Sequence, residues 1–257
     1  ATATMGYTRN LTTGEIVDQV LQAKRISGKK ITNLVFMGMG EPMMNYDNVM
    51  NAVEIITTGI GIAARRITIS TAGWADKIQQ MGDERRRVKL AISLHSADND
   101  TRTKLMPINK RFDLGALMSA LEHYYARTKM RVTYEYIFFD GVNDSDLDVA
   151  RLIKLARRVP CKINVIPFHS IRFTAPTGFS AKLRPSPRME HLVEKLRGAD
   201  LSVFVRSSAG EDIDAACGQL AVKTERTHRP RVSDEGVRAE STVLASALHT
   251  HLPITSR

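Results

Sequence analysis

Short apolar runs alternate with amphipathic segments along this chain from about residue 13 to residue 206. Six runs are β-rich, and most of them are nearly continuous in apolar character, as strands buried inside a parallel sheet require. We predict these six strands over residues 31–37, 66–70, 88–94, 131–138, 162–168 and 201–206. Strands that alternate with helices in this way are typical of parallel βα units.

The segments between the strands carry apolar residues at helical spacing. They predict helices over residues 13–27 and around residues 49–56, 114–121 and 149–156. Asp113 and Ser145 suit helix N-caps, and Gly28 and Gly198 suit helix ends. The prediction is an α/β fold, a partial TIM-like (β/α)6 barrel. Because a helix comes first, we expect the first strand of the barrel to be missing from this chain.

The pattern fades after Leu220, where the sequence becomes rich in Arg, Thr, Ser and Glu and holds no aromatic residue. We predict one barrel domain over residues 1–220 and a basic, low-complexity, disordered tail over residues 221–257. The irregular stretch over residues 170–187 contains Gly178 and three prolines, and we expect it to cover the ligand site.

Charge and cysteine content narrow the class of protein. The chain has 37 Lys and Arg against 27 Asp and Glu, a formal net charge of +10. This charge is compatible with a polyanionic partner such as RNA and equally with an ordinary solvated basic surface. Two cysteines are too few for a disulfide framework. No apolar run approaches the roughly 18 residues of a membrane span, so we expect a cytoplasmic protein with no membrane partner.

Polar residues stand where four of the predicted strands end. The first strand is followed by Gly40 and Glu41, and the second ends at Ser70. The third ends in the segment Ser93-Leu94-His95, and the fifth is followed by His169. Because ligand sites of α/β barrels lie at the carboxyl ends of the strands, the four ends predict one shared pocket.

The second cysteine, Cys217, stands among small residues in Asp214-Ala215-Ala216-Cys217-Gly218. Small neighbours leave a thiolate accessible to a bulky substrate, so Cys217 is a candidate nucleophile, although most free cysteines are inert. Cys161 lies at a strand entrance, and we interpret it as structural. Phosphate-loop, zinc-helix and serine-hydrolase motifs are absent from the sequence.

Together these residues resemble a known family, the radical S-adenosylmethionine RNA adenine methyltransferases of the RlmN and Cfr type. The resemblance covers residues 1–220. Its motifs, in chain order, are Gly38-Met39-Gly40-Glu41-Pro42, Arg66-Ile67-Thr68-Ile69-Ser70-Thr71, Ala91-Ile92-Ser93-Leu94-His95, Met106-Pro107-Ile108-Asn109-Lys110, Cys161-Lys162-Ile163-Asn164-Val165-Ile166-Pro167-Phe168 and Asp214-Ala215-Ala216-Cys217-Gly218-Gln219-Leu220.

The resemblance implies a partial barrel that binds S-adenosylmethionine beside a [4Fe-4S] cluster. It implies that the cofactor is held by Gly40, Glu41, Ser70, Ser93, Leu94, His95 and His169. Cys217 matches the cysteine that is methylated on sulfur and passes the carbon to an adenine ring. The implied function is methylation of adenine C2 in 23S rRNA and in tRNA, with a reducing electron-transfer protein as a further partner.

Three departures from the family keep alternatives open. The Cys-x3-Cys-x2-Cys cluster motif is absent, so this chain holds no metal ligands and we expect them upstream of Ala1, which leaves this chain inactive by itself. The upstream cysteine that resolves the RNA adduct is absent too. Ala209 and His169 replace the residues common in RlmN members. The alternatives are a Cfr-like C8 methyltransferase and an RNA-binding barrel without catalysis.

Overall fold

The computed structural model describes residues 8–38, 40–168 and 178–206 of the chain. Six parallel strands form one sheet, and they lie in the order in which they occur along the chain. The strands are β1 (Leu34–Phe36), β2 (Ile67–Thr71), β3 (Lys89–Ser93), β4 (Val132–Tyr136), β5 (Cys161–Val165) and β6 (Val203–Val205). This topology confirms the predicted α/β fold, and it is consistent with a partial barrel.

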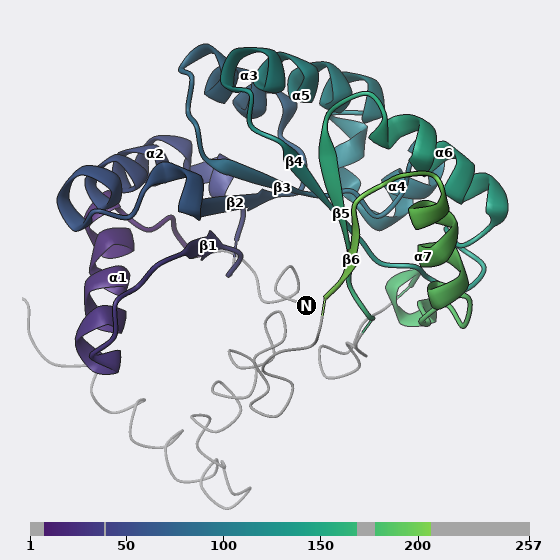
Figure 1. Cartoon of the computed structure of the whole chain (residues 1–257), viewed down its shortest axis with the longest axis horizontal. Helices are drawn as coiled ribbons and strands as arrows, with labels where there is room; N and C mark the ends of the chain where they lie inside the picture. Colours follow the sequence, from purple (N-terminus) through teal and green to yellow (C-terminus); the bar gives the residue numbers. More distant parts are fainter. Residues whose placement is uncertain (1–7, 39, 169–177, 207–257) are drawn as a thin grey trace, which may run out of the picture. The chain divides into compact units, whose positions relative to one another are not determined.

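Helices connect the strands and lie along one side of the sheet (Figure 1). The α-helices are α1 (Thr13–Ser27), α2 (Tyr46–Ile55), α3 (Ala75–Asp83), α4 (Asn99–Leu105), α5 (Leu114–Thr128), α6 (Asp146–Ala156) and α7 (Met189–Gly198). Short turns of other helix types are η2 (Pro42–Asn45), η3 (Ile56–Ile60), η4 (Ala64–Arg66), η5 (Pro107–Lys110) and η7 (Ser180–Lys182).

The predicted strands all exist, but most of them are shorter than the apolar runs that predicted them. For example, residues 31–37 contain the three-residue strand β1. A strand ends where its hydrogen bonds to the neighbouring strand stop. The run of apolar residues can continue beyond that point into a buried connection. The predicted helices are present as well. Helices α3, α4 and α7 were not predicted. Helices α3 and α7 do carry buried apolar residues at helical spacing, so the sequence held a signal that the prediction missed, whereas α4 has Arg102 as its buried residue.

Capping residues explain several helix boundaries. Asp113 and Ser145 accept backbone hydrogen bonds at the starts of α5 and α6, as predicted, a contribution of about 1 kcal/mol each. Gly28 ends α1 in the left-handed conformation with φ of 62°. Gly198 is the last residue of α7, which confirms the predicted helix end, and the left-handed residue that follows is Asp200, with φ of 61°.

The two faces of the sheet differ in chemistry. One face packs against the helices and carries apolar side chains such as Ile69, Ile92 and Tyr134, which are fully buried in the hydrophobic core. The strand registers place a second set of side chains on the opposite face, where Thr68, Ser70 and Ser93 are only partly buried. A polar second face is unusual in a parallel sheet, which normally is apolar on both.

No helix among the described residues is long and apolar enough to cross a membrane. The predicted tail over residues 221–257 and the first half of the stretch over residues 170–187 lie outside the described residues. The second half of that stretch is fastened to the end of β4: Ser186 donates its backbone N–H to the Phe138 carbonyl over 3.1 Å.

Candidate functional site

A row of polar side chains crosses the second face of the sheet near the carboxyl ends of the strands. The registers place Ser93 of β3 beside Glu135 of β4, and Glu135 beside Asn164 of β5. The preceding row contains Ser70 of β2 beside Ala91 of β3. Because neighbouring residues in parallel strands share a face, these side chains form one polar surface.

Glu135 is the most buried charged residue of this surface, with 6% of its area exposed. The Ser70 hydroxyl donates to its Oε2 over 3.5 Å, and Oε1 has no hydrogen-bond partner among the described residues. Burial raises the pKa of the Glu135 carboxyl, while the charge of Arg206 at the end of β6 opposes this rise. A buried carboxyl with a free oxygen is a group suited to a ligand.

The end of β3 is held in an unusual conformation. The backbone N–H groups of Leu94 and His95 both donate to the Glu135 carbonyl, over 3.0 and 3.4 Å. His95 then turns into the left-handed region with φ of 54°, and the Asn143 amide donates to its carbonyl over 2.5 Å. Such a conformation is uncommon outside glycine and clusters at functional sites.

Besides Glu135 Oε1, one atom of the His95 ring also lacks a hydrogen-bond partner among the described residues. Its Nδ1 is buried and has no hydrogen-bond partner among the described residues. Burial and the charge of Arg102 lower the pKa of His95 to about 4, so the ring is neutral at pH 7. A neutral imidazole can accept a hydrogen bond from a ligand or donate one.

Gly40 and Glu41 shape the end of β1. Gly40 has φ of 86°, and a Cβ built there would meet nothing within 4 Å, which leaves open space beside the backbone. The Glu41 carboxylate accepts the backbone N–H of Met43 over 3.0 Å and that of Ala72 over 2.8 Å. Burial nevertheless raises its pKa. Glu41 therefore ties the ends of β1 and β2 together, and each oxygen keeps a lone pair for a ligand.

Arg102 supports the site from the helical side. It is fully buried, and burial lowers its pKa to about 10. Its guanidinium donates to the Ala72 carbonyl over 2.7 Å, to the Leu94 carbonyl over 3.2 Å and to Asn109 Oδ1 over 2.8 Å. No carboxylate pairs with it within the described ranges. It is a positive charge that joins the ends of β2 and β3 through neutral acceptors.

The predicted site residues divide into three groups. Gly40, Glu41, Ser70 and the Ser93-Leu94-His95 segment all lie at the carboxyl ends of β1, β2 and β3, as their sequence positions implied. Leu94 is fully buried in the core, and its backbone groups already bond within the protein: its N–H donates to the Glu135 carbonyl and its carbonyl accepts from Arg102 and Ser96. His169 and Cys217 lie outside the described residues.

Sequence reasoning missed Glu135, Arg102 and Asn143. Glu135 had a signal, since it is the one carboxylate inside the apolar run over residues 131–138. Burying a charge in a strand costs free energy unless the charge is paired or binds a ligand, so a carboxylate in an apolar run indicates such a partner. Arg102 and Asn143 had no comparable signal, because their burial depends on tertiary contacts.

Cys161 is not part of this surface. Its side chain lies on the helix-facing side of β5, and its thiol contacts the Ala156 carbonyl at 3.3 Å. It is 8% exposed, and burial raises its pKa to about 11, which agrees with the structural role predicted from the sequence. Among the residues that the structure describes, no cluster of His, Cys, Asp or Glu could hold a metal ion.

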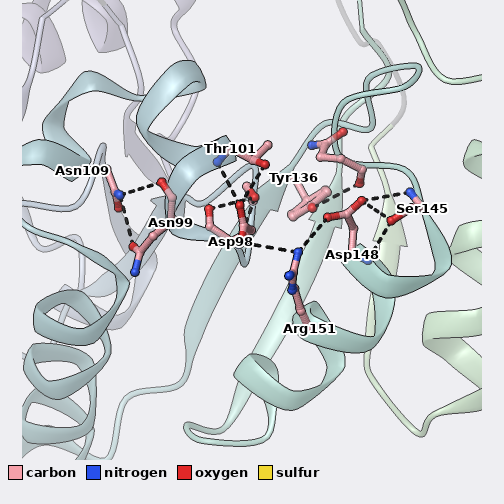
Figure 2. Close-up of polar contacts among 10 residues, drawn as sticks. Asp98, Asn99, Thr101, Asn109, Tyr136, Ser145, Asp148 and Arg151 are labelled. Carbon is pink, nitrogen blue, oxygen red and sulfur yellow. Dashed lines mark hydrogen bonds and ion pairs between the residues drawn. The ribbon is translucent and has the colours of Figure 1, made fainter.

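A hollow of about 450 Å³ lies on the helical side, between α4, α5 and α6. Figure 2 shows that charges at its rim pair with one another: Arg151 lies 3.4 Å from Asp98 and 3.9 Å from Asp148. Asp98 caps α4 and Asp148 completes the capping box of α6. These side chains are already used to hold helices, so we do not assign the hollow as the functional site.

Known proteins resemble this chain in sequence and in fold. A family model described as the radical SAM superfamily matches residues 2–153. A probable dual-specificity RNA methyltransferase RlmN from Flavobacterium psychrophilum is 43% identical over 229 residues, which cover 87% of this chain and 65% of that protein. The RlmN enzyme of Desulfotalea psychrophila is 42% identical over 232 residues, covering 86% of this chain and 62% of the relative.

A solved structure of a radical SAM methyltransferase also resembles this chain. The crystal structure of a radical SAM methyltransferase from Sphaerobacter thermophilus matches with a TM-score of 0.74 and 43% identity, over 84% of this chain and 63% of that one. The chain thus spans less than two thirds of the length of these relatives. The family model and the shared fold make this chain a member of the radical SAM superfamily, similar over most of its length to the RNA methyltransferases named RlmN.

Proposed function

We propose that this chain is the cofactor-binding barrel of an RNA methyltransferase that modifies C2 of an adenine in 23S rRNA and in tRNA. The observation that carries the proposal is the convergence of Gly40, Glu41, Ser70 and the Ser93-Leu94-His95 segment at one edge of the sheet, in a chain 43% identical to an RlmN protein. RNA substrates imply a cytoplasmic reaction, and the net charge of +10 is compatible with them.

The residues at this edge fit S-adenosylmethionine. The open space beside Gly40, the spare lone pairs of Glu41 and the unpartnered His95 Nδ1 are suited to a ligand that carries hydroxyl and amino groups. When bound, S-adenosylmethionine supplies a transferable methyl group. We propose that it is held by Gly40, Glu41, Ser70, Ser93, Leu94, His95 and His169.

The second group that the superfamily implies, a [4Fe-4S] cluster, does not fit this chain. Such a cluster needs about three or four cysteine thiolates, whereas the sequence has two cysteines and one of these is the buried Cys161. These residues therefore support no reaction step through the cluster. We also propose that a separate electron-transfer protein reduces the cluster.

Cys217 is the proposed methyl acceptor. Its thiolate would attack the methyl carbon, the bond from this carbon to the cofactor sulfur would break, and S-adenosylhomocysteine would leave. The small residues around Cys217 leave room for this approach. Cys161 cannot take this role, because its thiol is buried on the other side of the sheet.

The test uses the complete reading frame that contains this chain, purified without oxygen and supplied with reductant, S-adenosylmethionine and 23S rRNA or tRNA. We expect 2-methyladenosine in the RNA and a methyl group on Cys217, both lost in the Cys217→Ala variant. Unmodified RNA together with RNA binding would favour the non-catalytic barrel. A C8 product would favour the Cfr-like alternative, which the RlmN names of the relatives do not support.

A further inference from the structure

We propose that Glu135 is a ligand-binding residue, whose carboxyl group accepts a hydrogen bond from a sugar hydroxyl of the bound nucleoside. The inference rests on the proposed function, in which S-adenosylmethionine binds at this edge of the sheet. It adds a residue from β4 to a site that the sequence predicted from the ends of the other strands.

The contacts of the Glu135 side chain with the described residues do not account for its burial. The one hydrogen bond it makes with them, from Ser70, is 3.5 Å long, whereas a normal O–H···O bond is about 2.5–3.0 Å. Its Oε1 has no partner among the described residues. Leaving a buried polar group unsatisfied costs about 1–3 kcal/mol, so this carboxyl destabilises the fold unless a ligand completes its hydrogen bonds.

The surroundings of Glu135 suit a hydroxyl group. Ser93 and Asn164 flank it in the same row of the sheet, and both are partly exposed. Ala91 and Ser93 are the β3 residues between Ser70 and Glu135, and their small side chains let these two groups meet across an intervening strand. In dinucleotide-binding folds an Asp or Glu carboxylate likewise accepts a hydrogen bond from a ribose hydroxyl.

The position of Glu135 is also tied to the predicted ligand segment. Its carbonyl accepts the backbone N–H groups of Leu94 and His95, so its side chain leaves the backbone beside that segment. His95 Nδ1, the other unpartnered buried atom, belongs to the same pair of strand ends. Two unsatisfied polar atoms at adjacent strand ends point to one ligand that contacts both.

The experiment compares three variants of the full chain. Glu135→Leu removes both oxygens, Glu135→Gln keeps one acceptor, and Thr133→Val is the matched control, one row away on the same face of β4. Dissociation constants for S-adenosylmethionine and for 5′-methylthioadenosine, which has the same nucleoside without the amino acid, are measured by equilibrium dialysis. Urea unfolding of each variant measures stability in parallel.

We expect Glu135→Leu to weaken both ligands about tenfold or more, the equivalent of one lost hydrogen bond at roughly 1.4 kcal/mol. Glu135→Gln should stay within about threefold of the wild type, because its amide oxygen still accepts, and Thr133→Val should not change binding. Glu135→Leu should unfold at an equal or higher urea concentration than the wild type, since an unsatisfied polar group has been removed.

Three outcomes overturn the inference. Unchanged binding of both ligands by Glu135→Leu shows that the carboxyl does not touch them. If Glu135→Leu weakens the binding of S-adenosylmethionine but not that of 5′-methylthioadenosine, the carboxyl contacts the amino-acid part of the ligand and not the sugar. If Glu135→Leu fails to fold, wild-type binding of the 2′-deoxy and 3′-deoxy forms of 5′-methylthioadenosine decides, and equal affinity for both and for the parent nucleoside overturns it. A wild-type chain that binds neither ligand instead refutes the proposed function itself.

Discussion

The Arg102 guanidinium donates from Nη1 to Oδ1 of Asn109 over 2.8 Å, deep between α4 and η5. Both side chains are buried, and Asn109 in turn donates to the Asn99 carbonyl over 3.1 Å and to the Thr103 hydroxyl over 2.9 Å. Asn109 is therefore the link between the helical layer and the arginine that joins the ends of β2 and β3. This contact explains why a polar residue stands in the Met106-Pro107-Ile108-Asn109-Lys110 motif.

Replacing Asn109 by leucine should lower the free energy of unfolding by about 3 kcal/mol, because a buried charged donor would lose its acceptor. Asn109→Asp keeps an acceptor for Arg102 and should lose less, although it gives up the bonds donated to Asn99 and Thr103. Urea denaturation of both variants measures the difference. Equal losses in the two variants would show that Arg102 gains little from this contact.

Helices α3 and α5 approach each other closely at Gly82. A Cβ built there would lie 2.7 Å from the His123 ring and 3.2 Å from the Cα atom of Tyr124. We expect Gly82→Ala to lower the unfolding free energy by about 1–3 kcal/mol through overpacking. Gly14→Ala in α1 is the matched control. A Cβ at Gly14 would meet no atom within 4 Å, so alanine there should be neutral or stabilising.

Glu41 holds two loops together through its two carboxylate oxygens. In Glu41→Gln a single oxygen remains, so either the Met43 or the Ala72 N–H loses its acceptor. We expect a loss of about 1–2 kcal/mol in unfolding free energy, measured by urea denaturation. Full stability in this variant would mean that water replaces the lost acceptor without cost.

The neutral His95 ring makes stability depend on pH. Its folded pKa of about 4 lies below the ordinary value of 6.5, so the unfolded chain binds the proton more tightly. Stability from this residue is therefore complete above about pH 6.5 and is lost as the pH falls, by about 2 kcal/mol at pH 5. Arg102 is the charged group that adds to this effect.

Urea unfolding at pH 8 and at pH 5 tests the dependence on pH, with His95→Asn as control. Asparagine does not titrate and tolerates the left-handed conformation at this position. The wild type should lose more stability than the variant between the two pH values. The same loss in both proteins would show that His95 is not the group responsible.

Cys161 should resist alkylation in the folded protein. Its pKa of about 11 leaves very little thiolate at pH 8, and 8% of its surface is exposed. Treatment with iodoacetamide followed by peptide mass spectrometry should find this thiol unmodified without urea and fully modified in urea. Rapid labelling in the absence of urea would contradict the buried position.

Local patterns were enough to predict much of this fold. The six apolar runs predicted the six strands, and capping residues such as Asp113 and Ser145 predicted helix starts, because strand burial and capping depend on residues close in sequence. Helix α3 escaped this reasoning. It packs against α5, and its buried residues Ile78 and Met81 do stand at helical spacing, so the sequence contained a signal that the prediction missed.

The candidate site divides in the same way. The chain's residue pattern was enough to place Glu41, Ser70 and His95 at strand ends, and parallel strands bring their carboxyl ends to one edge. The folded chain was needed to show that Glu135 joins them and that Arg102 lies buried behind them. These two roles depend on the register between strands and on contacts between segments far apart in the chain, such as Ser70 with Glu135. The energetic cost of a buried charge becomes visible only once its surroundings are known.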